Sequence, residues 1–132
     1  MELTMRKLMG IGPTMLGVMT VLIVIQNRAD AQDAKSGEAV FRQCAACHAL
    51  EAGKNKIGPS LHGLLGREAG TAEGFPYSEA MKGSAIVWDE QSLSEYLKAP
   101  KKMVPGTKMT FPGLKDEAKL QNLIAYLKQA TQ

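Results

Sequence analysis

The clearest pattern along the chain is a stripe of aliphatic residues near its C-terminal end. Between residues 116 and 130, these side chains recur at positions i, i+3, i+4 and i+7: Leu120, Leu123, Ile124 and Leu127. A helix with this spacing places all of them on one face and the intervening polar residues on the other. The pattern therefore predicts a helix over 116–130 that buries one face against the rest of the protein.

Two shorter helices are predicted over residues 34–44 and 90–98. Each follows an aspartate that can cap it, Asp33 or Asp89, and Pro100 ends the second. Their apolar faces consist of Val40, Phe41 and Cys44 in the first and of Leu93, Tyr96 and Leu97 in the second. We expect one further helical turn at residues 78–82. Because no alternating strand pattern follows residue 31, the predicted fold class is all-α, with three main helices and one short helix.

The first 31 residues have the layout of a secretory signal peptide. Arg6 and Lys7 precede an uncharged apolar run at 8–25, and Ala-Asp-Ala at 29–31 follows as a small-x-small cleavage site. An uncleaved membrane anchor is the alternative, because the apolar run approaches the length that spans a bilayer. We expect an exported, periplasmic protein with one functional domain, residues 32–132.

The charge balance excludes one class of partner. The chain carries 16 Lys and Arg against 13 Asp and Glu, and the expected signal peptide removes three of the basic and two of the acidic residues. The remaining domain is only mildly basic, so its bulk charge does not favour binding to nucleic acid. A local basic face could still steer a protein partner.

Between the first two main helices lies a long glycine-rich stretch without a helical or strand pattern. Its glycines are Gly53, Gly58, Gly63, Gly66, Gly70 and Gly74. A structureless stretch of this length is unusual in a compact domain, and a domain of about 100 residues buries only modest apolar surface. We infer that a large prosthetic group organises this stretch and forms part of the core.

The sequence F-R-Q-C-A-A-C-H contains Cys44, Cys47 and His48 in the C-x-x-C-H spacing of c-type haem attachment. On a helical turn, two residues between the cysteines allow both sulfurs to reach one edge of a porphyrin and add to its vinyl groups. The adjacent histidine can then give a ring nitrogen to the iron. Covalent attachment would hold the cofactor in a domain too small to enclose it by packing alone.

Three other interpretations of these residues compete with haem attachment. A structural zinc would need a fourth ligand, and His62 is the one further histidine in the chain. A thioredoxin-like redox pair would need a βαβ context that the pattern lacks. A plain disulfide across two helical residues has poor geometry and leaves His48 without a role.

The group at the sixth iron position decides what a haem protein does. An open position binds small molecules, whereas a protein ligand leaves electron transfer as the function. The candidates in the exported domain are His62, Met81, Met103 and Met109.

Several further motifs occur in a fixed order. They are G-P-S-L-H-G-L-L-G-R at 58–67, G-F-P-Y at 74–77, Trp88, S-E-Y-L at 94–97, P-K-K-M-V-P-G-T-K-M at 100–109 and L-I-A-Y-L-K at 123–128. Together with C-A-A-C-H, they make the chain resemble the class I cytochrome c family, which includes mitochondrial cytochrome c and the bacterial periplasmic c-two group. The resemblance covers nearly all of residues 37–131.

This resemblance implies a small cytochrome c fold wrapped around one covalently attached haem c. Cys44 and Cys47 match the thioether cysteines, and His48 and Met109 match the two iron ligands. Pro59 matches the proline whose carbonyl accepts a hydrogen bond from the axial histidine, which would fix the tautomer of that ring.

The resemblance also implies polar partners around the haem. Tyr96 and Thr107 match residues that are hydrogen-bonded on the methionine side. Tyr77 and Trp88 match partners of the haem propionates, with Arg67 close behind. Donors of this kind are needed because an unpaired buried carboxylate is costly.

Partners and function follow from the same resemblance. Five lysines match a ring around the exposed haem edge that docks onto acidic partner surfaces: Lys54, Lys56, Lys101, Lys102 and Lys108. The implied protein is a monomeric periplasmic one-electron carrier between a cytochrome bc complex and a terminal oxidase or photosynthetic reaction centre. It is not an enzyme, and it meets the membrane only through these complexes unless its N-terminal segment is retained. The alternatives are a haem peroxidase and the haem subunit of a periplasmic dehydrogenase.

Two methionines depart from the family pattern. Met103 stands where mitochondrial members usually carry an aromatic residue, and it either fills that space or serves as a spare ligand for Met109. Met81 stands where many members carry an asparagine tied to buried water. We expect this change to make the haem pocket drier.

Overall fold

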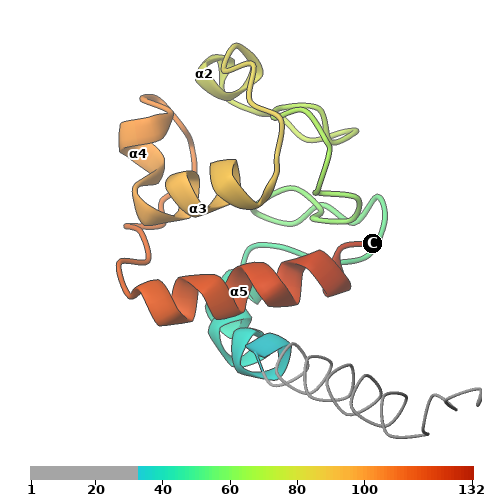
Figure 1. The fold of residues 1–132 in the computed structure, drawn as a ribbon. Coiled ribbons are helices and arrows are strands. Elements are labelled where there is room, and N and C mark those ends of the chain that lie inside the picture. The colour runs from blue at the N-terminus through green and yellow to red at the C-terminus, as the bar shows by residue number, and fades with distance from the viewer. Residues whose placement is uncertain (1–32) are drawn as a thin grey trace, which may run out of the picture.

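Three long helices and two single-turn helices form the regular structure of residues 33–132, which are the residues described in this computed structural model (Figure 1). The first helix occupies residues 33–45. The others are α2 (Glu79–Lys82), α3 (Glu90–Lys98), α4 (Pro100–Met103) and α5 (Glu117–Ala130). The predicted all-α fold class is confirmed. The expected signal peptide at 1–31 lies outside the described residues.

Side-chain caps define where α3 and α5 begin. The Asp89 carboxylate accepts a hydrogen bond from the Ser92 backbone N–H, and the Ser92 hydroxyl accepts one from the Asp89 N–H. This reciprocal pair satisfies two N–H groups that lack helical partners. Asp116 caps α5 through Lys119 N. The predicted cap at Asp33 is wrong, because Asp33 is already helical.

Pro100 both ends one helix and begins another. It follows Ala99, the residue that closes α3, and it is the first residue of α4. Proline fits the first position of a helix because its missing N–H would have no partner there. The sequence predicted Pro100 as a stop and therefore missed α4.

Two antiparallel helices build one half of the core. The start of α3 pairs with the end of α5 through Glu90 and Lys128, whose charged atoms lie 2.7 Å apart, and the end of α3 pairs with the start of α5 through Lys98 and Glu117 at 2.9 Å. Beneath these exposed pairs, the aliphatic stripe of α5 is buried with Phe41 and Leu97. The predicted docking face of this helix is confirmed.

The first helix crosses α5 at close range (Figure 1). A Cβ on Gly37 would overlap the backbone carbonyl of Asn122 and lie 2.7 Å from Tyr126 Cβ, so only glycine permits this approach. The Phe41 and Tyr126 rings pack with centroids 5.2 Å apart. The two ends of the chain segment 33–132 are thereby joined in one helical layer.

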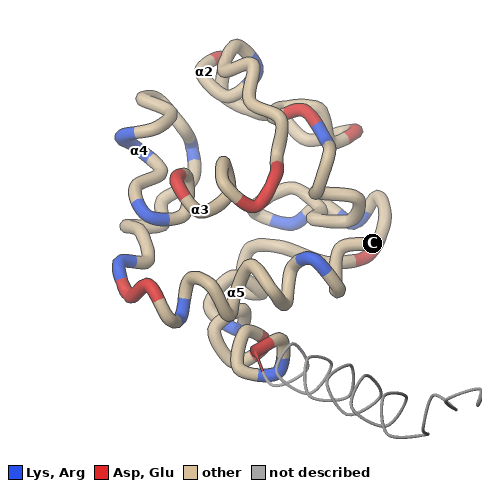
Figure 2. Tube along the Cα trace, in the orientation of Figure 1, with Lys and Arg blue, Asp and Glu red and all other residues tan. Residues whose placement is uncertain are grey.

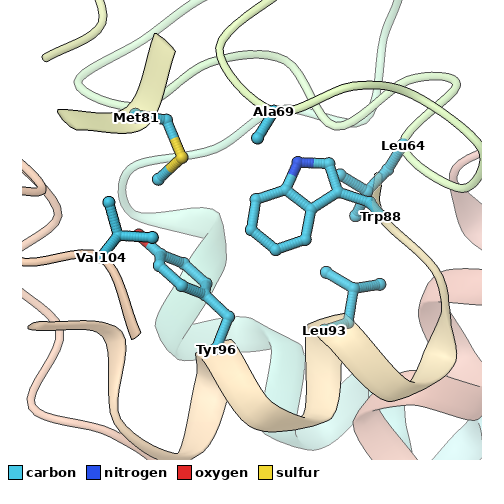
Figure 3. Close-up of a cluster of buried hydrophobic side chains, with 7 residues drawn as sticks. All are labelled: Leu64, Ala69, Met81, Trp88, Leu93, Tyr96 and Val104. Atoms are coloured by element: carbon cyan, nitrogen blue, oxygen red, sulfur yellow. The ribbon is translucent and has the colours of Figure 1, made fainter. Parts of the chain in front are cut away.

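A second buried cluster lies on the other side of the molecule, under the long loops (Figure 3). It consists of Leu64, Ala69, Met81, Trp88, Leu93, Tyr96 and Val104. Among residues 33–132 the strand content is one isolated antiparallel bridge between Glu68 and Val87. No helix in that part of the chain combines the length and apolar character needed to cross a membrane.

The glycine-rich stretch is held in place by scattered backbone hydrogen bonds. Gly66 N donates to Trp88 O at 2.8 Å, Trp88 N to Arg67 O at 3.0 Å, and Ala69 N to Ile86 O at 2.8 Å. Earlier in the same stretch, the Asn55 side-chain amide donates a hydrogen bond to Glu73 O at 2.9 Å. These bonds fix the conformation of the stretch, although it contains little regular structure.

Candidate haem-binding site

A cavity of about 420 Å³ lies between the two buried clusters. This volume falls in the range of cofactor pockets, and most of the lining is apolar. The cavity is lined by every cofactor-binding and iron-ligating residue predicted from the sequence: Cys44, Cys47, His48, Pro59, Arg67, Tyr77, Trp88, Tyr96, Thr107 and Met109. Residues from both ends of the chain and from the central loops therefore converge on one space.

The two cysteines lie where the first helix ends. Cys47 N and His48 N both donate to Cys44 O, at 3.0 and 2.9 Å, which turns the chain and brings both cysteines and the histidine to the cavity. The two cysteines are not bonded to each other. Burial, reinforced by the neighbouring Cys47, raises the pKa of the Cys44 thiol to about 11.

The alternative of a structural zinc finds no support in this arrangement. His62, the required fourth ligand, is exposed and does not line the cavity. Within residues 33–132, no group of three or more His, Cys, Asp or Glu side chains is arranged to hold a metal ion.

His48 forms one wall of the cavity with the segment that contains Pro59. The distance between His48 Nδ1 and Pro59 O is 2.8 Å. Since a carbonyl only accepts, Nδ1 carries the hydrogen and Nε2 keeps a lone pair for a metal. Burial lowers the pKa of His48, and although the Pro59 bond opposes this shift, the net direction is downward. The ring is therefore a neutral imidazole, as ligation requires.

Gly58 is a site residue that the sequence reasoning did not single out. It is buried, and a Cβ there would lie 2.7 Å from His48 Nδ1 and 2.9 Å from Nε2. Its N–H donates to Cys47 O at 2.8 Å. The glycine directly before Pro59 was the available signal for a close approach between backbone and ring.

Met109 belongs to the opposite wall, which is built from α3 and the turn after α4. The Tyr96 hydroxyl and Thr107 Oγ1 share a hydrogen bond of 2.9 Å, and Met109 N donates to the same Thr107 oxygen at 3.3 Å. Thr107 N in turn donates to Val104 O across the Pro105-Gly106 turn. Burial raises the pKa of Tyr96, and the Thr107 bond only partly offsets this, so the tyrosine stays neutral.

The other two methionines differ in their relation to the cavity. Met81 lines it and belongs to the buried cluster with Trp88 and Tyr96, whose rings lie 5.1 Å apart (Figure 3). Met103 packs against that cluster from outside and does not line the cavity.

Arg67 supplies the best test of whether a cofactor with carboxylates fits. Its terminal nitrogens donate to His62 O at 2.8 Å and Ser60 O at 3.1 Å, which fixes the guanidinium group. Its Nε is buried without a partner in the described structure. A buried donor without a partner is rare and calls for an explanation, and the carboxylate of a haem propionate in this cavity would supply the acceptor.

Tyr77 lines the cavity near this guanidinium group, and it is packed edge-on against Phe75 with centroids 4.8 Å apart. Its hydroxyl oxygen accepts a hydrogen bond from Ala72 N at 3.3 Å, which leaves its own O–H free to donate. Burial raises the pKa of Tyr77, so this donor persists above neutral pH.

Basic residues are spread along the backbone trace rather than gathered in one segment (Figure 2). Of the five predicted docking lysines, two lie on α4 and three lie in loops. Lys108 lines the cavity, and its Nζ donates to Pro76 O at 3.0 Å. Lys54 pairs with Glu51 at 3.0 Å, and Lys56 Nζ donates to Ala45 O at 2.5 Å. Lys101 and Lys102 are exposed on α4.

A helical shell around an apolar cavity, with a C-x-x-C-H turn at its edge, defines a c-type haem protein. The family model described as cytochrome c matches residues 34–131. The chain belongs to the cytochrome c family. Its proteins transfer electrons and bind one haem c covalently, so this chain is an electron carrier rather than an enzyme. Cys44 and Cys47 fit the C-x-x-C-H motif of haem attachment.

Individual relatives agree with this assignment. Cytochrome c2 of Blastochloris viridis is 58% identical over 102 residues, covering 76% of this chain and 80% of the relative. Cytochrome c of Nigella damascena is 49% identical over 107 residues, covering 80% of this chain and 96% of the relative. Among solved structures, cytochrome cH from Methylobacterium extorquens superposes with a TM-score of 0.68 at 48% identity, covering 72% of this chain and 96% of that one.

Proposed function

We propose that the protein is a periplasmic one-electron carrier whose haem iron is ligated by His48 and Met109. The observation that carries this proposal is that each residue lines the same cavity from a different wall and has its own supporting hydrogen bonds. The bound haem supplies an iron that cycles between two oxidation states. Two protein ligands leave no iron position for a substrate.

The surrounding residues keep the site nearly the same in both oxidation states. Pro59 fixes the orientation and tautomer of His48. Thr107 holds the backbone of Met109 while it pairs with the Tyr96 hydroxyl. We propose that Arg67 Nε and the Tyr77 hydroxyl donate to haem propionates, because each has a donor with no acceptor in the described residues. Groups that are already in place cost little reorganisation when charge moves.

The partners we propose are membrane redox complexes: a cytochrome bc complex as donor and a terminal oxidase or photosynthetic reaction centre as acceptor. Relatives named cytochrome c2 and cytochrome c-550 support this class of carrier. Lysines near the cavity mouth would steer a monomeric protein onto acidic surfaces of these complexes. We further propose that residues 1–31 direct export and are removed, which N-terminal sequencing of the exported protein would test.

The ligand assignment is tested by removing one methionine at a time. Met109→Ala should abolish the weak red absorption band of methionine-ligated ferric haem, whereas Met103→Ala should keep it, because Met103 does not line the cavity. The two variants are matched, since both truncate a half-buried methionine of the same segment. If the band survived in Met109→Ala, another sulfur would be the ligand and the proposal would be wrong. If it also disappeared in Met103→Ala, the pair would fail to separate ligation from packing.

A further inference from the structure

One large apolar side chain in the lining of the haem cavity is largely exposed to solvent. Ile57 is 81% exposed and lines the cavity beside Cys47 and Gly58. In residues 33–132 the other strongly exposed large hydrophobic is Val87, at 49%, and Val87 does not line the cavity. A single exposed apolar residue is common on protein surfaces, so exposure alone has no meaning. The position of Ile57 is what distinguishes it.

The local backbone holds Ile57 outward. On one side Lys56 N donates to Gly58 O at 2.9 Å, and on the other Gly58 N donates to Cys47 O at 2.8 Å. Pro59, the next residue, receives the His48 hydrogen bond. Ile57 is therefore presented on a backbone that is fixed on both sides. A contact residue fixed in this way loses little conformational entropy when a partner covers it.

One positive charge directly precedes Ile57 in the chain, and another lines the same cavity as Ile57. Lys56 precedes it and is tethered to Ala45 O, while Lys108 lines the same cavity and is tethered to Pro76 O. Both ammonium groups are held by neutral carbonyls, so their charge is not cancelled by these bonds. By contrast, Lys54 is neutralised by Glu51. An apolar side chain that follows one fixed cation in the chain and shares a cavity lining with another complements a surface with an apolar spot and carboxylates beside it.

We propose that Ile57 is the apolar contact through which an acidic redox partner is held at the cavity mouth. This inference rests on the proposed electron-carrier function. The lysines act at a distance and set the salt-dependent rate of encounter. Ile57 acts only on contact, and covering it with the partner's apolar surface lengthens the life of the complex.

The experiment compares two serine substitutions of exposed apolar residues, Ile57→Ser and Val87→Ser, in the haem-loaded protein. A purified terminal oxidase that oxidises c-type cytochromes is the probe. Burial of an isoleucine side chain is worth about tenfold or more in affinity. We therefore expect Ile57→Ser to raise the KM for the cytochrome about tenfold. Val87→Ser should behave like the unmodified protein.

Ionic strength separates the apolar contact from the charges. The Ile57→Ser variant should keep the same dependence of rate on salt, whereas Lys56→Gln should flatten it. Oxidation by ferricyanide, which needs no docking site, should be equal for the unmodified protein and the two serine variants, so that a damaged haem site would be recognised.

Each outcome decides between distinct conclusions. If Ile57→Ser and Val87→Ser have the same KM, the apolar contact is refuted while the carrier function stands. If the unmodified protein reacts with ferricyanide but not with the oxidase or with a cytochrome bc complex, the proposed function itself fails. If sedimentation shows a dimer that Ile57→Ser dissolves, the surface serves a second copy of this chain and the proposal is overturned.

Discussion

Substituting Gly58 by alanine should destabilise the protein, because the new side chain would press on the ring of His48. The new Cβ would lie 2.7 Å from His48 Nδ1 and 2.9 Å from Nε2, well inside van der Waals contact. The ring cannot move away cheaply, because Nδ1 is bonded to Pro59 O at 2.8 Å. Overpacking costs about 1–3 kcal/mol, and a lost hydrogen bond adds about 0.5–1.5 kcal/mol. We expect Gly58→Ala to lower the free energy of unfolding by about 2–4 kcal/mol.

Guanidinium unfolding of the ferric, haem-loaded protein, followed by haem absorbance, measures this loss. Gly53→Ala is the control, because Gly53 has φ +70° but no atom lies within 4 Å of a Cβ placed there. Its cost is backbone strain alone, about 1–2 kcal/mol. Gly58 has no such strain, so its cost is contact alone. A Gly58→Ala protein that is as stable as the unmodified protein, with an unchanged reduction potential, would refute the argument from contact with His48.

Substitutions at three further positions test the backbone conformation and the packing of the domain. Ala85 has φ 54°, the one positive value among the described non-glycine residues, so Ala85→Gly should raise the free energy of unfolding by about 1 kcal/mol in the same assay. Tyr96→Phe removes the hydrogen bond to Thr107 and should cost about 1 kcal/mol at neutral pH. Burial raises the pKa of Tyr96 above its usual 10. The stability that the neutral hydroxyl contributes is therefore present below pH 10 and is lost as the pH rises through the folded-state pKa. In that pH range, the difference in free energy of unfolding between the unmodified protein and Tyr96→Phe should become smaller. Met81→Asn places an amide in a buried apolar cluster, so it should lower the free energy of unfolding by about 1–3 kcal/mol and shift the reduction potential measured by voltammetry. The control Met81→Leu should lower the free energy of unfolding by less than about 1.5 kcal/mol and leave the potential near that of the unmodified protein.

Most of the helical structure could be predicted because each long helix carries its own local signal. The stripe of α5 and the Asp89 cap of α3 are readable within a few residues, and both occur where they were predicted. The single turn of α4 has no apolar period, and its proline signals an end as readily as a beginning. The predicted cap of the first helix was wrong because Asp33, although a good cap residue, already has helical conformation.

The haem site likewise has a part that the sequence predicts and a part that depends on the fold. Cys44, Cys47 and His48 are neighbours in sequence, so their chemistry is visible without a fold. The buried, unpartnered Nε of Arg67 could not be predicted from the sequence, because it depends on how the loop places the carbonyls of Ser60 and His62 around the guanidinium group.

Met103 and Met109 show most directly what a local sequence pattern cannot predict. Met103 and Met109 lie six positions apart in a segment without a strong period, so the local pattern alone cannot tell which side chain turns inward, and only the family resemblance favoured Met109. In the structure, Met103 is the last residue of α4 and packs on the outside of a cluster, while the Pro105-Gly106 turn brings Met109 to the cavity. Gly106 has φ +93°, a conformation that only glycine adopts readily, and so it allows this turn.

The architecture also explains why the long loops need the cofactor. Each buried cluster presents apolar residues to the cavity, Leu123 and Leu127 from one and Leu64 and Trp88 from the other. A 420 Å³ space between them would otherwise leave these surfaces without contacts, and the scattered backbone bonds of the loops offer little compensation. A haem attached at Cys44 and Cys47, near the end of the first helix, would fill this space and link both halves of the core. Its covalent attachment would then serve the folding of the domain as well as its chemistry, because it would keep the haem in the core.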